Sequence, residues 1–476
     1  MPLSCFSKIA LAASMLSALG VGTSQAAELD PFGKINHFVV IYTENRSFDG
    51  LFADLAGADG FARAKDIAPQ VDTDGTVLKV LPPVRVRDGL DKRFDKPLAN
   101  APFDLAPLAA ATDKTPDMVH RFYQEQEQID GGRMDRFAAV SDAGGLVMGY
   151  YGSGGQKLAG LAHDFVLLDH FHHAAFGGSF LNHFFLVCAC APKFENAPAK
   201  LMIALDAKSG FLARKNGSPA SAMDGPPQWV ADKQVTPDFY AVNTLQPSTP
   251  PFADDSRPED RLPPQTLPTI GERLSQKAIT WAWYAGGWDD VLAGKFKSYA
   301  DPENFQPHHQ PFNYFAAYAP GTKARAEHLK DGAELMAAIK EGALPAVAFY
   351  KPVGRDNEHP GYTNLTTGDE HVAGVIAAIM ASPNWADTAV IVTADENGGS
   401  WDHVAPPKGD RWGPGLRVPT LVVSPLARRG FVDHSVYDTT SILRTLEVRF
   451  GLAPLGTRDA AVADLRNAFT AEAETN

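Results

Sequence analysis

The chain has 476 residues, with 43 Lys and Arg against 56 Asp and Glu, which gives a formal net charge of −13. This acidic balance opposes binding to nucleic acid or to an anionic membrane surface, because both partners are themselves negatively charged. An anionic small-molecule substrate would need local neutralisation by a metal, by histidine or by helix ends.

Residues 1–26 predict a signal peptide. Lys8 supplies a positive charge, Ile9 to Val21 form an apolar run, and Ser24-Gln25-Ala26 is a small-x-small cleavage site. The apolar run is shorter than the roughly 20 residues that span a bilayer. No later stretch is long and uncharged enough, so we expect no integral membrane segment. The protein is therefore expected to be exported, to the periplasm or the medium, with residues 27–476 as a single domain.

Apolar runs rich in β-branched residues alternate with helical patterns along the mature chain. The strand-like runs lie at 37–43, 165–169, 279–284, 344–350, 389–394 and 419–424, and the clearest helical patterns lie at 369–381 and 437–450. Such alternation favours an α/β fold, with a mostly parallel sheet covered by helices on both faces. Residues 213–268 are rich in Pro, Asp and Ser and predict a loop-rich insertion.

Two of the predicted strands end on acids. The run 37–43 is followed by Glu44 and Asn45, and the run 389–394 is followed by Asp395 and Glu396. Ligands bind at the carboxyl ends of strands in open α/β sheets, and adjacent carboxylates repel unless a cation or proton lies between them. The pattern predicts one shared, oxygen-rich metal site. Loop acids and helix caps are the alternative explanation for either segment taken alone.

Gly177-Gly178-Ser179 precedes an apolar helical pattern. The glycines allow a tight turn, and the free N–H groups of a helix start bind anions. A hydroxyl at this position can attack a bound phosphorus atom. The alternative is that Ser179 only caps the helix, which is a common role of serine.

Four of the 14 histidines lie in segments with Gly, Pro or Trp turns. They are His120, His309, His359 and His403. A lone histidine is more often a satisfied surface or core residue than a ligand. Four in such segments favour phosphate binding or proton transfer.

Cys188 and Cys190 are the cysteines that remain after the signal peptide. Residues two apart make an awkward disulfide ring, so we expect two buried thiols on an apolar element. A bridge in an oxidising compartment is the alternative. Their spacing predicts no zinc site.

Several segments occur together in the order of one known family. They are Glu44-Asn45-Arg46-Ser47-Phe48-Asp49, residues 129–135, Gly177-Gly178-Ser179, His308-His309-Gln310-Pro311-Phe312, Glu358-His359-Pro360 and Asp395-Glu396-Asn397-Gly398-Gly399. From about residue 35 to 452 the chain resembles the bacterial phosphoesterase family of secreted acid phosphatases and non-haemolytic phospholipases C, in the alkaline-phosphatase superfamily. The resemblance implies a three-layer α/β/α sandwich and a hydroxyl nucleophile beside one divalent metal.

The resemblance also implies roles for individual residues. Glu44, Asn45, Asp395 and Glu396 match the metal-site positions, and Ser179 matches the nucleophile. His120, His309 and His359 match the residues that hold the phosphoryl oxygens, with His309 favoured over His308 by its place two residues before Pro311. All four metal-site residues offer hard oxygens, which suit Ca²⁺, Mg²⁺ or Mn²⁺ better than Zn²⁺.

Three features favour the acid phosphatase branch over the phospholipase C branch. The signal peptide lacks a twin arginine and the sequence ends soon after Leu452, whereas phospholipases C of this family resemble one another in a twin-arginine signal and extra domains. Ser179 follows the Gly-Gly pair, which resembles the acid phosphatase branch, whereas the phospholipase C branch has threonine there. We therefore expect an acid phosphatase that forms a phosphoserine and is aided in acid by protonated histidines.

Three other functions stay open. The first is a phospholipase C that acts on phosphatidylcholine-type diesters. The second is a protein that binds phosphate or metal without catalysis. A sulfatase is disfavoured because Gly177-Gly178-Ser179-Phe180 lacks the Pro and Arg of a modification motif. The physiological substrate and the oligomeric state are not predicted.

Overall fold

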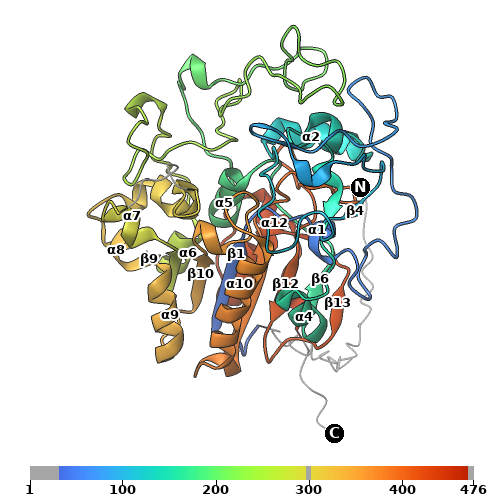
Figure 1. Ribbon diagram of the computed structural model, residues 1–476. Coiled ribbons are helices and arrows are strands. Elements are labelled where there is room, and N and C mark those ends of the chain that lie inside the picture. The colour runs from blue at the N-terminus through green and yellow to red at the C-terminus, as the bar shows by residue number, and fades with distance from the viewer. Residues whose placement is uncertain (1–31, 296–301, 470–476) are drawn as a thin grey trace, which may run out of the picture.

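The computed structural model describes residues 32–295 and 302–469 (Figure 1). The predicted signal peptide lies outside these residues. Within them, no helix combines the length and the apolar character that crossing a membrane requires.

The central sheet has eight strands. Their order is β13 (Phe431–Asp433), β6 (Val166–Leu168), β12 (Thr420–Val423), β11 (Thr388–Ala394), β1 (His37–Thr43), β10 (Val347–Lys351), β8 (Trp281–Ala285) and β9 (Leu329–Asp331). β12 pairs antiparallel with both of its neighbours, and every other pairing is parallel. The predicted α/β fold with a mostly parallel sheet is confirmed.

The six predicted strand runs correspond to β1, β6, β8, β10, β11 and β12. The two edge strands, β9 and β13, were not predicted. Each has three residues, which is too short for an alternating or continuous apolar pattern to stand out from loop sequence.

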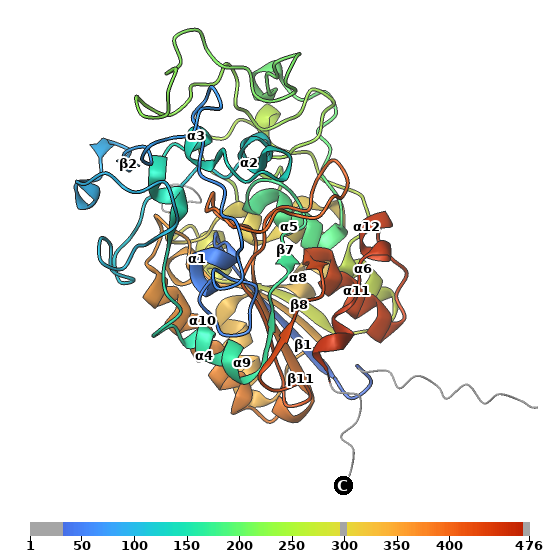
Figure 2. The same ribbon diagram turned by 90° about the vertical axis from the view of Figure 1, so that its right-hand side faces the viewer.

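Helices cover both faces of the sheet (Figures 1 and 2). On one side lie α5 (Ser179–Cys188), α6 (Ile270–Gln276) and α11 (Thr439–Phe450), and on the other lie α4 (Lys157–Asp164), α9 (Gly332–Glu341) and α10 (Leu365–Met380). Strand β1 shows why two cores form, because its successive side chains point to opposite faces. Phe38 and Val40 pack in one core, and Val39 and Ile41 in the other. The result is three layers.

The helix predicted at 369–381 begins four residues earlier than expected. Asn364 caps α10 by accepting a hydrogen bond from the Thr367 backbone N–H at 2.8 Å. The helix predicted at 437–450 begins at Thr439, where Asp438 is the cap. The periodic apolar pattern therefore locates both helices, whereas the capping side chain decides where each begins.

Short elements complete the described chain. The remaining α-helices are α1 (Phe48–Phe52), α2 (Phe122–Ile129), α3 (Phe137–Val140), α7 (Trp288–Leu292), α8 (Lys323–His328) and α12 (Thr457–Ala461). Two-stranded pairs form between β2 (Arg85–Val86) and β3 (Gly89–Leu90), between β4 (Phe103–Asp104) and β5 (Gly149–Tyr150), and between β7 (Phe171–His172) and β14 (Tyr437–Asp438).

Residues 202–269 form long loops at the top of Figure 1. Within this stretch, all of which the structure describes, η5 (Pro258–Asp260) is the only helix, and isolated bridges such as Arg214 with Trp229 are the only strand pairing. The stretch includes the segment 213–268 that its composition singled out.

The prediction for the two cysteines is wrong, because Cys188 and Cys190 form a disulfide. Cys188 is the last residue of α5, and Ala189 adopts a left-handed conformation with a φ of 48°. This turn leaves the two Cα atoms 5.1 Å apart, within the usual range for a disulfide. The sequence alone does not reveal the left-handed turn.

Candidate active site

The acids that follow β1 and β11 lie side by side. The two strands are parallel neighbours, and their register pairs Thr43 with Ala394, the residues just before the acids. Glu44 and Asp395 therefore leave the sheet at the same level. The side chains of Glu44, Asn45, Asp395 and Glu396 are all buried.

Asn45 turns the chain sharply after β1. Its φ is 61°, in the left-handed region that asparagine tolerates better than most residues, and its backbone N–H donates to Oδ1 of Asp395 at 3.1 Å. Gly398 packs against this turn, and a Cβ at Gly398 would lie 2.6 Å from the Asn45 carbonyl oxygen. Position 398 therefore has no room for a larger residue, which explains one glycine of the pair after Asp395 and Glu396.

Ser179 is the first residue of α5 and projects its hydroxyl toward the acids. Gly178 occupies the capping position, so Ser179 does not serve as the N-cap. Its Oγ lies 3.3 Å from Oδ1 of Asn45 and 3.4 Å from Oε1 of Glu396. The turn before Ser179 requires glycine at position 177. Its φ is 88°, and the Cβ of any other residue there would lie 2.5 Å from the Phe122 backbone nitrogen.

Lys351 links two of the acids and was not singled out from the sequence. It is the last residue of β10, it is fully buried, and its Nζ lies 3.4 Å from Oε2 of Glu44 and 3.2 Å from Oδ2 of Asp395. Asn357, also missed, donates its side-chain amide to Oε2 of Glu44. These contacts fix the orientation of Glu44.

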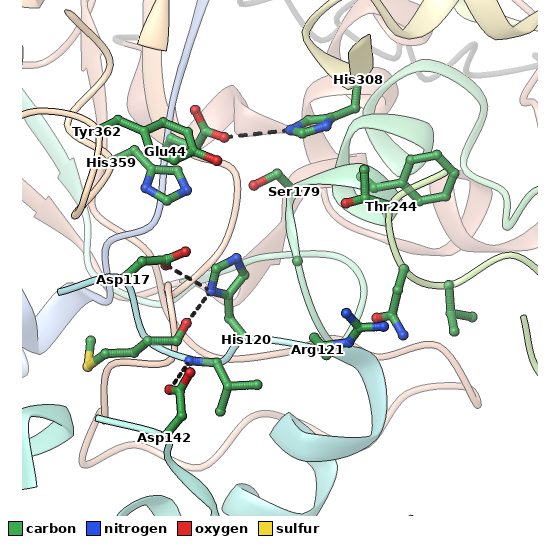
Figure 3. A pocket seen from close by; sticks show the side chains of 16 residues that line it. Glu44, Asp117, His120, Arg121, Asp142, Ser179, Thr244, His308, His359 and Tyr362 are labelled. Atoms are coloured by element: carbon green, nitrogen blue, oxygen red, sulfur yellow. Dashed lines mark hydrogen bonds and ion pairs between the residues drawn. The ribbon is translucent and has the colours of Figure 1, made fainter. Parts of the chain in front are cut away.

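Of the adjacent histidines 308 and 309, His308 reaches the cavity. His309 is fully buried, with Nε2 3.2 Å from Oε1 of Glu44. His308 lines the cavity, with Nε2 3.7 Å from the same oxygen, and neither of its ring nitrogens has a hydrogen-bond partner among the described residues (Figure 3). The geometry therefore favours His308 over His309 for contact with a ligand, contrary to the sequence-based preference.

His120 and His359 lie on the opposite side of the Ser179 hydroxyl from His308 in Figure 3. Nε2 of His120 lies 3.4 Å, and Nε2 of His359 3.0 Å, from Nδ2 of Asn45. The ring of His359 stacks on Tyr362 with 3.5 Å between ring centroids. The side chain of Asn45 therefore contacts both imidazoles through Nδ2 and the Ser179 hydroxyl through Oδ1.

The cavity in front of Ser179 has a volume of about 310 Å³. Most of its wall is polar, and one side is formed by Val242, Asn243 and Thr244 from the loop-rich stretch. Oδ1 of Asn243 accepts a hydrogen bond from the Phe122 N–H at 3.2 Å, which anchors that stretch to the start of α2. Nothing in the sequence pattern of residues 242–244 marked them as part of the site.

Two buried carboxylates of the site differ in their preferred charge state. Burial alone would raise the pKa of Glu44, but Lys351 and His309 hold that pKa well below its usual range. For Glu396, burial raises the pKa to about 8; His120 opposes this rise and Asp395 adds to it. Glu44 therefore favours its charged form more strongly than Glu396 does.

The three predicted phosphate-binding histidines also differ. Burial would lower the pKa of His120, but the negative charges of Glu396 and Asp117 raise it to about 9. Burial lowers the pKa of His359, and it lowers that of His309 to about 3 despite the proximity of Glu44. Of the three, His120 thus favours the cationic form, whereas burial opposes that form in His309 and His359.

The residues fit a divalent cation. Glu44, Asp395 and Glu396 are three buried carboxylates, and Lys351 contacts only Glu44 and Asp395. Burial raises the pKa of Glu396, and a bound cation would offset the cost of burying its charge. Oxygens of Glu44, Asn45, Asp395 and Glu396 are hard ligands. Nitrogen ligands are also close, because Glu44, His308 and His309 present donor atoms within 4.8 Å of one another, as do Asp117, His120 and His359.

His403, the fourth histidine singled out from the sequence, belongs to a separate cluster. Its Nδ1 lies 2.7 Å from Oδ2 of Asp49, and Arg417 is 3.0 Å from Asp49 and 2.9 Å from Asp402. Arg417 is fully buried and already balances these acids. His403 is not among the residues that line the cavity.

Several known proteins are similar in sequence to this chain. Non-hemolytic phospholipase C from Pseudomonas aeruginosa is 26% identical over 476 aligned positions, which cover 91% of this chain and 57% of that protein. Phospholipase C A from Mycobacterium tuberculosis is 24% identical over 471 positions, covering 91% of this chain and 77% of that protein. The chain thus spans little more than half of the Pseudomonas relative.

A solved structure of a protein in the alkaline phosphatase superfamily from Vibrio parahaemolyticus is 12% identical, with a TM-score of 0.31, and covers 74% of this chain and 73% of that one. The sequence model of the Phosphoesterase family matches residues 35–453, nearly the whole described chain. The chain therefore belongs to the Phosphoesterase family.

Proposed function

We propose that the protein is a phosphomonoesterase in which Ser179 attacks phosphorus. The observation that carries the proposal is the position of Ser179 Oγ at the start of α5, inside a small polar cavity and within 3.4 Å of Asn45 and Glu396. A protein that only binds phosphate or metal has no need of a hydroxyl aimed into the cavity. The family match supports hydrolysis of phosphoric esters.

The chain supplies several groups for the phosphoryl oxygens. His120 is the cationic donor, Nδ2 of Asn45 is a neutral donor, and the free N–H groups at the start of α5 face the same space. A divalent metal held by Glu44, Asn45, Asp395 and Glu396 would lower the pKa of the Ser179 hydroxyl. As the bond from Oγ to phosphorus forms, the bond to the leaving oxygen breaks, and water later hydrolyses the phosphoserine.

The charge of His120 bears on the pH range of activity. Because its pKa is raised to about 9, His120 stays cationic through acid and neutral pH and loses its charge in alkali. We therefore expect activity through acid and neutral pH and a decline as the pH rises through about 9. Export, inferred from residues 1–26, is part of the same proposal.

Phospholipase C activity is the second candidate, and the named relatives favour it. It requires an apolar surface for a diacylglycerol leaving group. The cavity has Asp117, His120, Asn243 and Thr244 in its wall, and such a wall suits a polar leaving group better. The cavity is our reason for placing phosphomonoesters first.

The test is to compare an aryl phosphomonoester, an aryl phosphodiester and phosphatidylcholine as substrates of the wild-type protein and of Ser179→Ala, from acid to alkaline pH. We expect the monoester to be preferred and every activity to vanish in the variant. Preference for phosphatidylcholine would establish the second candidate. Equal turnover by wild type and Ser179→Ala would exclude both schemes.

A further inference from the structure

A second cavity of about 810 Å³ adjoins the candidate active site. Both cavities are lined by Asp117, Asp142 and Tyr362, which Figure 3 shows on the side away from Thr244. The second cavity, here called the basic groove, takes its other charged lining residues from the hairpin segment 85–93 and from Lys114. The cationic residues are Arg85, Arg87, Arg93 and Lys114.

Two of these cations are already neutralised. Arg93 is bound to Asp91 at 2.6 Å, and Lys114 is bound to Glu303. Arg85 and Arg87 differ, because no carboxylate of the described residues lies within 4.0 Å of either guanidinium. The guanidinium of Arg85 donates to the Met223 carbonyl oxygen at 3.3 Å, and its Nε is buried without a hydrogen-bond partner among the described atoms.

The acids that face the groove do not cancel this charge. Asp117 lies 3.6 Å from Nδ1 of His120, so its carboxylate is already paired with that imidazole. Asp142 accepts from the Val119 N–H at 2.8 Å, and burial raises the pKa of its carboxyl. Arg85 and Arg87 are therefore the two cations of the groove that no carboxylate of the described residues pairs, in a protein whose net charge is −13.

We propose that the basic groove binds a second anionic group carried on the leaving-group side of the substrate. The preferred substrates are then phosphomonoesters with a further phosphate or carboxylate, such as sugar bisphosphates. Arginine is the side chain best suited to such groups, because its planar fork forms paired, charge-assisted hydrogen bonds with phosphate and carboxylate. A cationic headgroup such as choline would meet like charge in the groove. This inference rests on the proposed phosphomonoesterase function.

The test compares fructose 1,6-bisphosphate with fructose 6-phosphate as substrates. We expect wild type to prefer the bisphosphate in kcat/KM, and Arg85→Gln and Arg87→Gln each to reduce that preference about tenfold, the effect of one lost charge-assisted contact. Arg257→Gln removes an exposed guanidinium from residues 202–269 and should retain the preference, which controls for net charge. Added salt should weaken the preference of wild type.

Binding to Ser179→Ala, measured by calorimetry, separates this inference from the proposed function. Tighter binding of the bisphosphate that depends on Arg87 supports the groove even if turnover follows another route. Equal binding of the two sugars, or an unchanged preference in both arginine variants, overturns the inference and leaves phosphomonoester hydrolysis intact.

Discussion

The hydroxyl of Ser179 lies 3.3 Å from Oδ1 of Asn45, although 134 positions separate the two residues in the sequence. Asn45 follows the central strand β1, and Ser179 opens the helix α5 that packs on the same sheet. Because a buried strand and a packed helix hold the two groups, the site is preorganised. The hydroxyl is positioned before any substrate arrives.

Removal of a buried acid should remove the metal. We expect Glu44→Gln and Asp395→Asn each to lower the metal content of the purified protein severalfold, because a divalent ion needs several anionic oxygens to compete with water. Elemental analysis measures this directly. Both acids also contact Lys351, so each variant should be checked for folding by circular dichroism.

Asp402→Asn is the matched control for these variants. Asp402 is as buried as Glu44 and Asp395, and like Asp395 it comes after β11 in the sequence. It binds Arg417 in the separate cluster. Its substitution should reduce stability and leave the metal content as in wild type. Metal loss only in Asp402→Asn, or in none of the three, would refute the shared oxygen-rich site.

Substitutions of the adjacent residues His308 and His309 should have different effects on phosphate binding and on stability. Since His308 lines the cavity and His309 is fully buried behind Glu44, His308→Asn should weaken inhibition by phosphate roughly tenfold with little loss of stability. His309→Asn should mainly lower the melting temperature, because it leaves a gap in a packed region. If only His309→Asn weakened phosphate binding, the sequence-based preference for His309 would be right.

Ionisation of Glu447 should lower the stability of the folded protein as the pH rises. Burial raises the pKa of this carboxyl on α11 to about 8; Asp459 adds to the rise and Arg444 opposes it. A glutamate in the unfolded chain titrates near about 4.3. The contribution of Glu447 to stability is therefore complete below that pH and is lost as the pH rises through about 8.

Glu447→Gln, which cannot ionise, should have a melting temperature that depends less on pH, with the largest gain over wild type, a few degrees, in mild alkali. Thermal unfolding followed by circular dichroism from acid to alkaline pH measures the difference. Parallel curves for the two proteins would show that Glu447 titrates normally in the folded state.

The sequence located the strands well because buried parallel strands are continuous apolar runs of β-branched residues. It also identified Glu44 and Asp395, since acids after such strands stand out. Lys351 escaped detection because a lysine after an apolar run resembles an ordinary exposed strand end. Only the pairing of β10 with β1 places it between two buried carboxylates.

Other parts of the site depend on packing that no local pattern encodes. Which of His308 and His309 faces the cavity is set by the turn of a single short helix, η6 (Pro307–His309). Asn243 and Thr244 reach the cavity from irregular loops, where neither periodicity nor capping signals apply. The resemblance to a family supplied the order of the motifs, but it could not supply the walls of the cavity.

The central claim is that Ser179 becomes phosphorylated during turnover. The direct measurement is rapid acid quenching of the protein with an aryl phosphomonoester, followed by mass spectrometry of the peptide that contains Ser179. We expect a phosphoryl adduct on Ser179 of wild type, and neither adduct nor turnover in Ser179→Ala. Continued turnover by a folded Ser179→Ala protein, with no adduct in wild type, would contradict it.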